Sequence, residues 1–433
     1  MTAKDEIIYL DNNATTQLDP AVVEEMLPFL TASYGNPSSS YKFGAEPRKG
    51  IERARERTAA LLDCEPDEIV FTSCGTESNN AAINSSLQFD PRGKHIVTSA
   101  VEHSSVLRHC QDLAKRGCEV TFLGVDGDGN LDLDELVRAI RPDTAIVSLM
   151  WANNETGVVF PAEKIAEICC EKRVLFHTDA VQAVGKIPIH LRDSAINFLS
   201  LSAHKFHGPK GIGALHVNRR SRFRPSIIGG GQENGRRAGT ENVASIVALG
   251  KAAERAAESM EEEQTRVRTM RNRFEKTIRE RVSGVSINGA GTVRLPNTSS
   301  FSFDGIESNA ALMLLDRHSI CCSAGSACRT GSQEASHVLR AMNLGEERAR
   351  GSLRFSFGRF NPESDVDRTI EIVPKVIEKL RGLSSGTAAE EQWRLSWRSS
   401  RLCMDYLSPR VVIVIVWLCS SHLAEGVNGE ISP

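Results

Sequence analysis

Five short apolar runs between Ile69 and Leu215 decide the fold: IVFT (69–72), HIVTS (95–99), EVTFL (119–123), TAIVSLM (144–150) and RVLFHTDA (173–180). Their length and their β-branched and aromatic content predict buried strands. Segments with helical spacing, such as 161–172, lie between them. This alternation indicates an α/β domain with a mostly parallel sheet. Ligands of such sheets bind at the carboxyl ends of the strands, so the chemistry should follow those runs.

A second, smaller α/β domain is expected toward the carboxyl terminus. Residues 244–281 form a long, charged, helix-like stretch, and SSFSF (299–303) and SLRFSF (352–357) predict strands on either side of a helix at 307–317. We therefore expect a large domain over residues 16–250. The small domain would combine residues 1–15 with 251–384, and residues 385–433 would form an extension of unknown structure.

Composition limits the classes of function. The chain has 433 residues, a net charge of −3 and no basic run, so we expect no direct contact with nucleic acid. The apolar run at 411–418 is shorter than the ~20 residues of a membrane helix, so no membrane contact is expected. Eleven cysteines without a C-x-x-C pair, and a polar start without a signal core, predict free thiols in the cytoplasm.

A lysine follows the apolar run INFLSLS (196–202) in a loop rich in Ser, His and Gly. Lys205, in SAHKFHGPKGIG (202–213), is a candidate for a Schiff base with an aldehyde cofactor; Lys210 competes with it, and an ordinary surface lysine is the commoner case. Asp179 ends the preceding predicted strand. A carboxylate there would keep the pyridinium nitrogen of pyridoxal phosphate (PLP) protonated, although a helix N-cap is the alternative role.

Other motifs suit a phosphate and an aromatic ring. In FTSCGTESNN (71–80), Gly75 and Thr76 open a helix after a strand, which makes either a phosphate cradle or a capping box with Thr76 as the N-cap. His103, in SAVEHSSV (99–106), would stack on the ring. Asn153 and Asn154, in WANNETG (151–157), would bond a phenolic oxygen. Thr240, in GGGQENGRRAGTEN (229–242), would reach a phosphate, within its own chain or across a subunit boundary. Each motif alone also suits an ordinary loop.

Together these stretches resemble the NifS/IscS-type cysteine desulfurases, within the class V aminotransferase-fold PLP enzymes. The same order includes YLDNNATT (9–16), YGNPSS (34–39), HTDAVQAVGK (177–186), SAGSACRTG (323–331) and SLRFSFGRF (352–360). The resemblance extends from Tyr9 to about Ser384. It implies an aspartate aminotransferase-like fold (fold type I), a PLP cofactor, L-cysteine as substrate and a homodimer. It also implies a sulfur-acceptor protein, either an iron–sulfur scaffold or a tRNA thiolation enzyme.

The resemblance also implies the role of each site residue. Catalysis would rest on Lys205 as Schiff-base lysine, His103 as ring-stacking acid/base and Cys328 as persulfide carrier and transient iron–sulfur ligand. Asp179 and Gln182 would contact the ring nitrogen and the ring oxygen, and Asn154 would lie near that oxygen and the substrate. Arg354 would bind the substrate carboxylate, since a guanidinium suits a bidentate contact. The phosphate ligands would be Gly75, Thr76, Ser202, His204 and the partner's Thr240.

The sequence departs from the family pattern at Cys74, Asn234 and Ala335, and leaves other functions open. Selenocysteine lyase, an aminotransferase for small amino acids and a non-catalytic sulfur-relay scaffold would share the fold. A zinc module of His318, Cys321, Cys322 and Cys328 is disfavoured by its spacing. We expect Cys321 and Cys322 to be core thiols at a strand end.

Overall fold

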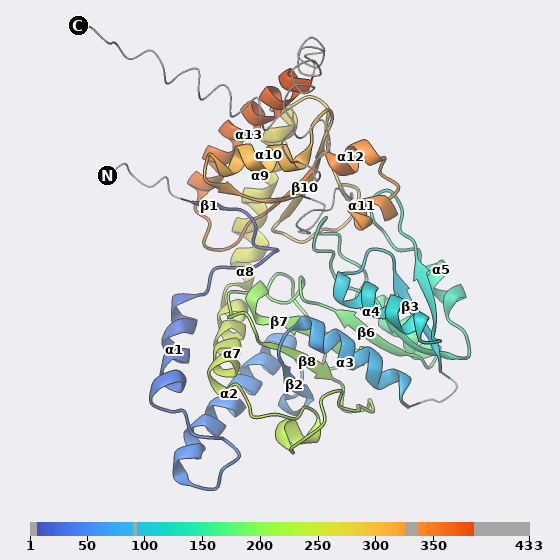
Figure 1. The fold of residues 1–433 in the computed structure, drawn as a ribbon, viewed down its shortest axis with the longest axis vertical. Helices are drawn as coiled ribbons and strands as arrows, with labels where there is room; N and C mark the ends of the chain where they lie inside the picture. The colour runs from blue at the N-terminus through green and yellow to red at the C-terminus, as the bar shows by residue number, and fades with distance from the viewer. Residues whose placement is uncertain (1–6, 90–92, 325–335, 385–433) are drawn as a thin grey trace, which may run out of the picture.

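The computed structural model describes residues 7–89, 93–324 and 336–384. Its larger part is built on a seven-stranded sheet in the order β2-β8-β7-β6-β5-β3-β4 (Figure 1). The strands span β2 (Ile69–Thr72), β3 (His95–Ser99), β4 (Glu119–Leu123), β5 (Thr144–Ser148), β6 (Leu175–Asp179), β7 (Phe198–Ser202) and β8 (Gly213–Val217). All five runs predicted to be strands form strands of this sheet.

The sheet is mostly parallel, as predicted. β4, β3, β5, β6 and β7 run parallel to one another, whereas β8 is antiparallel to both β7 and β2. Residues 203–212 join β7 to β8, and so short a connection cannot contain the crossover helix that parallel pairing needs. β8 therefore turns back, and the loop at this turn carries Lys205.

One predicted burial is wrong. We expected the run at 119–123 to be buried, but in β4 only Leu123 is fully buried and Glu119 and Phe122 are exposed. β4 is the edge strand of the sheet and pairs on one side only, with β3.

Helices cover both faces of the sheet and form two separate apolar cores. α3 (Gly75–Leu87) and α4 (Ser104–Lys115) contribute Ile83, Val106 and Cys110 to one core. On the other face, α2 (Ala45–Leu62), α6 (Ala162–Glu171) and α7 (Val243–Glu258) contribute residues such as Leu62, Ile165 and Leu249. α1 (Pro20–Thr31) packs along α7, and α5 (Leu133–Ala139) follows β4. The sheet is thus the middle layer of three.

A third core belongs to the smaller part of the molecule. Its sheet has the order β12-β13-β10-β9, and β1 pairs separately with β11. The elements are β1 (Ile8–Tyr9), β9 (Val285–Ile287), β10 (Thr298–Phe303), α10 (Ser308–Asp316), β11 (Ile320–Cys321), β12 (Ser323–Ala324), α11 (His337–Ala341), α12 (Glu346–Arg350), β13 (Ser352–Ser356) and α13 (Glu363–Ser384). The domain limits that we drew remain a prediction.

The stretch at 244–281 is helical, but it is not one continuous α-helix. α7 is followed by α8 (Met260–Glu262), by the π-helical turn η5 (Glu263–Val267) and by α9 (Arg268–Arg281). α7 packs in the larger part, whereas Phe274 of α9 lies in the core of the smaller part. The π-helical turn therefore marks the passage between them, and such turns occur often near functional sites. Among the described residues, no helix combines the length and the apolar character that crossing a membrane requires.

Candidate active site

A cavity of about 310 Å³ lies at the carboxyl ends of β6 and β7, where β12 and β13 also reach it. Its lining brings together most of the residues proposed from the sequence. They are Gly75, Thr76, His103, Asn154, Asp179, Gln182, Ser202, His204, Lys205 and Arg354. Asn13, Asn79 and Ser105 line it too, and sequence reasoning had assigned them no role. The volume suits a small organic ligand.

Lys205 is held in the cavity by the amino-terminal segment of the chain. Its Nζ donates hydrogen bonds to the carbonyl oxygens of Asn13, at 2.6 Å, and Ala14, at 2.7 Å. Burial, and then the charges of Lys186 and Arg354, lower the pKa of this amine to about 7. Lys210 is exposed and does not line the cavity. The geometry therefore favours Lys205 as the amine that meets an aldehyde.

Asp179 and Gln182 form the wall beside the lysine. Asp179 ends β6 and is 6% exposed; its carboxylate accepts hydrogen bonds from Asn79 Nδ2, at 2.7 Å, and from the backbone N–H of Val181, at 3.0 Å. Gln182 Nε2 donates to the carbonyl oxygen of Asn13 at 2.9 Å. Both side chains are thus fixed before any ligand binds, as a preorganised site requires.

The start of α3 provides the end of the cavity suited to an anion. The N-cap is Cys74, and its side chain makes no capping hydrogen bond, so the capping box that we considered with Thr76 as the N-cap does not form. The first helical N–H groups stay free for a phosphate. A Cβ added at Gly75 would lie 2.7 Å from Val181 Cγ2, so only glycine allows this close approach. Ser202 and His204 line the same cavity.

His103 combines a structural role with a place in the cavity wall. It is the N-cap of α4, and its Nδ1 accepts a hydrogen bond from the backbone N–H of Ser105 at 3.2 Å. A neutral imidazole that accepts at Nδ1 carries its proton on Nε2. His103 therefore has one nitrogen engaged in the cap and presents the other as a donor.

Arg354 lies in the centre of β13 and is 6% exposed. Its Nη1 donates to the carbonyl oxygen of Asn154 at 2.8 Å, and its Nη2 forms an ion pair with Asp11 at 2.6 Å. Ser323 Oγ donates to the same carboxylate oxygen of Asp11 at 2.8 Å. Arg354 is thus oriented from two sides. Asp11 lies within the YLDNNATT motif but had received no role from the sequence.

One proposed residue falls outside this cavity, and another lies outside the described residues. Thr240 is exposed and is not among the lining residues. Cys328 and Ala335 lie outside the described residues, as does the extension at 385–433.

The neighbouring thiols Cys321 and Cys322 lie at a strand end and against a core. Cys321 ends β11, and Cys322 packs against the core of the smaller part; burial raises the pKa of both thiols. Within the described ranges, one group of ligand-type side chains is close enough to hold an ion: Cys64, Glu68 and His216. None of His318, Cys321 and Cys322 belongs to it.

The cavity fits PLP on three observations of this structure. The uncapped start of α3 suits a phosphate, Asp179 suits a pyridinium nitrogen, and Lys205 suits an aldehyde. Asn79 Oδ1 and Arg354 Nε are buried without a hydrogen-bond partner, although buried polar atoms are normally paired.

Comparison with known proteins gives the class. Residues 8–369 match the family model described as aminotransferase class-V, and the chain therefore belongs to this family. It is similar to the cysteine desulfurase of Trichormus azollae, with 51% identity over 387 residues that cover 89% of this chain and 97% of the relative.

Solved structures agree with this assignment. A NifS-like protein matches with a TM-score of 0.81 and 37% identity, covering 87% of this chain and 100% of that one. A structure titled SspA in complex with cysteine matches with a TM-score of 0.72 and 36% identity, covering 82% and 99%. The predicted family and fold class are confirmed. The names of the relatives support the predicted enzyme activity.

Proposed function

We propose that this chain is a PLP-dependent cysteine desulfurase, which converts L-cysteine to L-alanine and keeps the sulfur as a persulfide on Cys328. The observation that carries the proposal is the position of the Lys205 amine. It lies in one cavity with the Asp179 carboxylate and the Arg354 guanidinium. These three groups match an aldehyde, a ring nitrogen and an amino-acid carboxylate. Membership of a family whose relatives are named cysteine desulfurases points to the same reaction.

The described residues divide the binding of the cofactor among them. Lys205 would hold PLP covalently, Asp179 its ring nitrogen, and Gln182 and Asn154 its ring oxygen. Gly75, Thr76, Ser202 and His204 would hold its phosphate. Burial, then the charges of Lys205 and Lys210, lower the pKa of His204 to about 4, so this imidazole is neutral at pH 7. When bound, PLP supplies an electron sink for the pair of electrons released from the substrate Cα–H bond.

The side chains then act on the substrate. Arg354 would bind the carboxylate of L-cysteine, and the Lys205 amine would remove the Cα proton. His103 moves protons at the substrate through Nε2. The Cys328 thiolate attacks the substrate sulfur, an S–S bond forms and the Cβ–S bond breaks. In balance, L-cysteine and the Cys328 thiol give L-alanine and the Cys328 persulfide.

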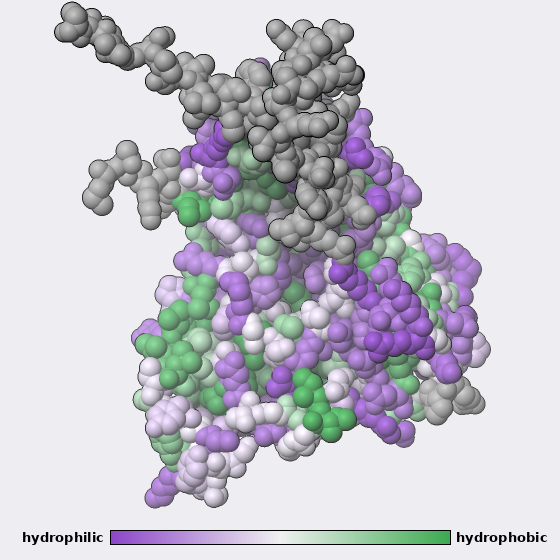
Figure 2. Space-filling model, viewed as in Figure 1, coloured by the Kyte–Doolittle hydropathy of each residue, from purple (hydrophilic) through white to green (hydrophobic). Residues whose placement is uncertain are grey.

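The proposal includes a homodimer. The α1 surface exposes Val23, Leu27 and Leu30 at 44%, 54% and 58%, and Figure 2 shows hydrophobic residues gathered over this side of the molecule. Apolar groups that remain exposed on one face favour an interface. The exposed Thr240 would reach the phosphate of the partner's site. We place the enzyme in the cytoplasm and its persulfide with an iron–sulfur scaffold or a tRNA thiolation enzyme, with Cys328 as a transient iron–sulfur ligand.

Product analysis with two cysteine variants tests the function. The purified chain should release equal amounts of alanine and sulfide from L-cysteine with a thiol reductant. Cys328→Ser should stop sulfide release but keep the visible absorbance of the bound cofactor. Cys170→Ser, which alters an exposed thiol, serves as the control.

The same assays separate the alternatives. Full sulfide release by Cys328→Ser contradicts the sulfur-transfer role. A 2-oxo acid product would indicate an aminotransferase. A colourless, inactive chain would indicate a scaffold, and faster turnover of L-selenocysteine would indicate a lyase.

A further inference from the structure

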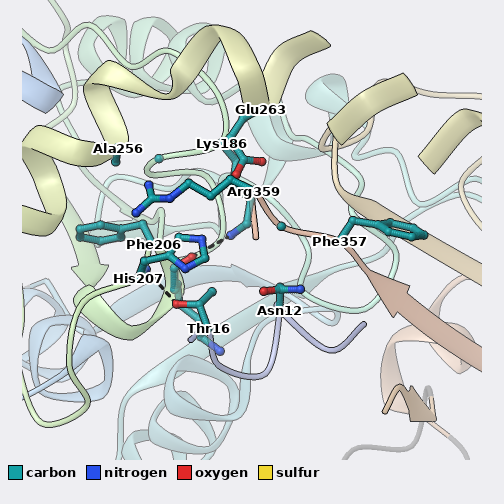
Figure 3. A pocket seen from close by; sticks show the side chains of 12 residues that line it. Asn12, Thr16, Lys186, Phe206, His207, Ala256, Glu263, Phe357 and Arg359 are labelled. Carbon is teal, nitrogen blue, oxygen red and sulfur yellow. Dashed lines mark hydrogen bonds between the residues drawn. The ribbon is translucent and has the colours of Figure 1, made fainter. Parts of the chain in front are cut away.

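Lys186 is a buried lysine that lies behind the proposed PLP site. It follows β6 and Gln182 in the chain and is 4% exposed. It does not line the 310 Å³ cavity but lies in a smaller space with Asn12, Glu263 and Arg359, which Figure 3 shows from close by. A lysine side chain is rarely buried unless its charge is paired and hydrogen-bonded. The mechanism proposed above leaves it without a role.

The hydrogen bonds that the Lys186 ammonium donates go to two residues of the proposed PLP site, Gln182 and Lys205. Its Nζ donates to Gln182 Oε1 at 3.3 Å, to the carbonyl oxygen of Gln182 at 3.2 Å and to that of Lys205 at 3.5 Å. An ammonium donates hydrogen bonds and accepts none. The amide oxygen of Gln182 must therefore face Lys186. Its NH₂ group donates to the carbonyl oxygen of Asn13, and both Gln182 and Asn13 line the cavity.

The charge of Lys186 acts on the same site. It is the second cause, after burial, of the lowered pKa of Lys205. Arg354, Asp11 and Asp179 also shift the pKa of Lys205. The charge of Lys205 in turn contributes to the lowered pKa of His103 and of His204. Glu263, in the π-helical turn η5, partly balances Lys186: burial lowers the pKa of the lysine and raises that of the carboxyl, and their attraction opposes both shifts.

A second contact ties Lys186 to the same turn. Gln264 Nε2 donates to the carbonyl oxygen of Lys186. Arg359, on the segment that follows β13, also acts on Glu263 and forms an ion pair with Asp19. Lys186 thus contacts both the wall of the cavity and the π-helical turn η5, which joins the two parts of the molecule.

We propose that Lys186 is a positioning residue for the PLP site: it fixes the Gln182 amide with its NH₂ group toward the ring oxygen and holds the main chain of Lys205. This inference rests on the proposed function, because it gives Gln182 the ring oxygen as its partner. The Lys186 ammonium, which lies 3.5 Å from the Lys205 carbonyl oxygen, also favours the neutral form of the Lys205 amine that reacts with an aldehyde.

A double-mutant cycle tests the orientation of Gln182. Lys186→Met removes the charge and the donors, Gln182→Leu removes the amide, and Lys186→Arg keeps a cationic donor. Pyridoxal phosphate itself is titrated into the full-length chain freed of cofactor. We expect each single variant to bind about tenfold more weakly and the double variant much less than 100-fold more weakly, because coupled residues are non-additive. Lys186→Arg should recover part of the affinity. A double variant about 100-fold weaker would overturn the orientation role.

The pH profile of Lys205 tests the effect of charge. The cofactor-free chain is labelled with an amine-reactive reagent at a series of pH values, and the Lys205 peptide is measured by mass spectrometry. Lys186→Met should move the midpoint up by about one pH unit, which lowers labelling at pH 7 several-fold. An unchanged midpoint in the folded variant would overturn this part.

Two controls complete the design. Lys276→Met changes an exposed lysine and should alter neither readout. Lys186→Gln also lacks the charge and serves for both readouts if Lys186→Met fails to fold. Neither readout needs turnover of cysteine. A chain that shows both effects but releases no sulfide would therefore refute the proposed function and leave the role of Lys186 standing.

Discussion

The cavity at the end of the main sheet and the core of the smaller part are both buried, but the cavity is lined by charged side chains and the core is filled by aromatic ones. The cavity wall holds a lysine, a carboxylate and an arginine, and two of its polar atoms lack partners. The core centres on Phe274, which packs edge to face with Phe301, Phe355 and Phe357 at ring-centroid distances of 5.6, 4.9 and 5.5 Å. Buried polar groups cost stability, whereas packed rings provide it. Substitutions in the two regions should therefore separate activity from stability.

The largest effect is expected at Lys205. Lys205→Ala should lower alanine formation from L-cysteine by about 10³-fold or more, because the amine serves both as cofactor link and as base. Stability in urea should stay the same or rise, since the substitution removes a buried amine whose pKa is already lowered. Lys210→Ala is the matched control. Activity within tenfold of the wild type would refute the assignment.

The smaller core should show the reverse. Phe274→Ala should lower the free energy of unfolding by about 3–5 kcal/mol, the usual cost of removing a buried phenylalanine. Phe274 is fully buried and is not among the residues that line the cavity. Urea unfolding measures the loss, and the remaining folded protein should keep its activity per molecule. A loss below 1 kcal/mol would show that this core matters less than its packing indicates.

Asp179→Asn should reduce activity by about 10²-fold and leave the free energy of unfolding nearly unchanged. Asparagine keeps the size of the side chain, but it offers no charge to hold a protonated ring nitrogen. The visible spectrum of the bound cofactor should shift as its protonation changes. A variant that loses stability and keeps its activity would contradict the expected separation of activity from stability.

The smallest effect concerns pH. The pKa of Lys205 in the folded chain is about 7, below its ordinary value of 10.5. Below pH 7 the amine is charged, so capture of pyridoxal phosphate by the cofactor-free chain should slow about tenfold per pH unit.

The same shift predicts how stability depends on pH. Between pH 7 and 10.5 the unfolded chain binds more protons at this lysine than the folded chain. The Lys205 contribution to stability therefore rises with pH over that window. Lys205→Ala should lose this rise. Equal pH profiles for the two proteins would contradict the lowered pKa.

Much of this architecture could be predicted from local sequence. Apolar runs located all five predicted strands, and polar residues that follow them line one cavity. The order of strands in a sheet depends on the whole chain, so the local sequence of β4 did not indicate that it is an exposed edge strand. The charged stretch at 244–281 did not reveal its π-helical turn, because charge spacing alone does not distinguish helix types.

The site itself was only partly predictable. Asp11 and Lys186 lie within the quoted motifs, but their partners are distant in sequence: Asp11 pairs with Arg354, and Lys186 contacts Lys205. Such pairing depends on the folded arrangement. The roles of all site residues, Cys328 above all, remain predictions.

The central claim is that the sulfur of L-cysteine passes to Cys328, and mass spectrometry tests it most directly. The purified enzyme is mixed with L-cysteine without reductant, thiols are trapped, and the peptide that contains Cys328 is analysed. We expect this peptide to gain the mass of one sulfur atom, in amounts equal to the alanine formed, and to lose it on reduction. Lys205→Ala should show no gain. Alanine formed while the Cys328 peptide stays unmodified would contradict the claim.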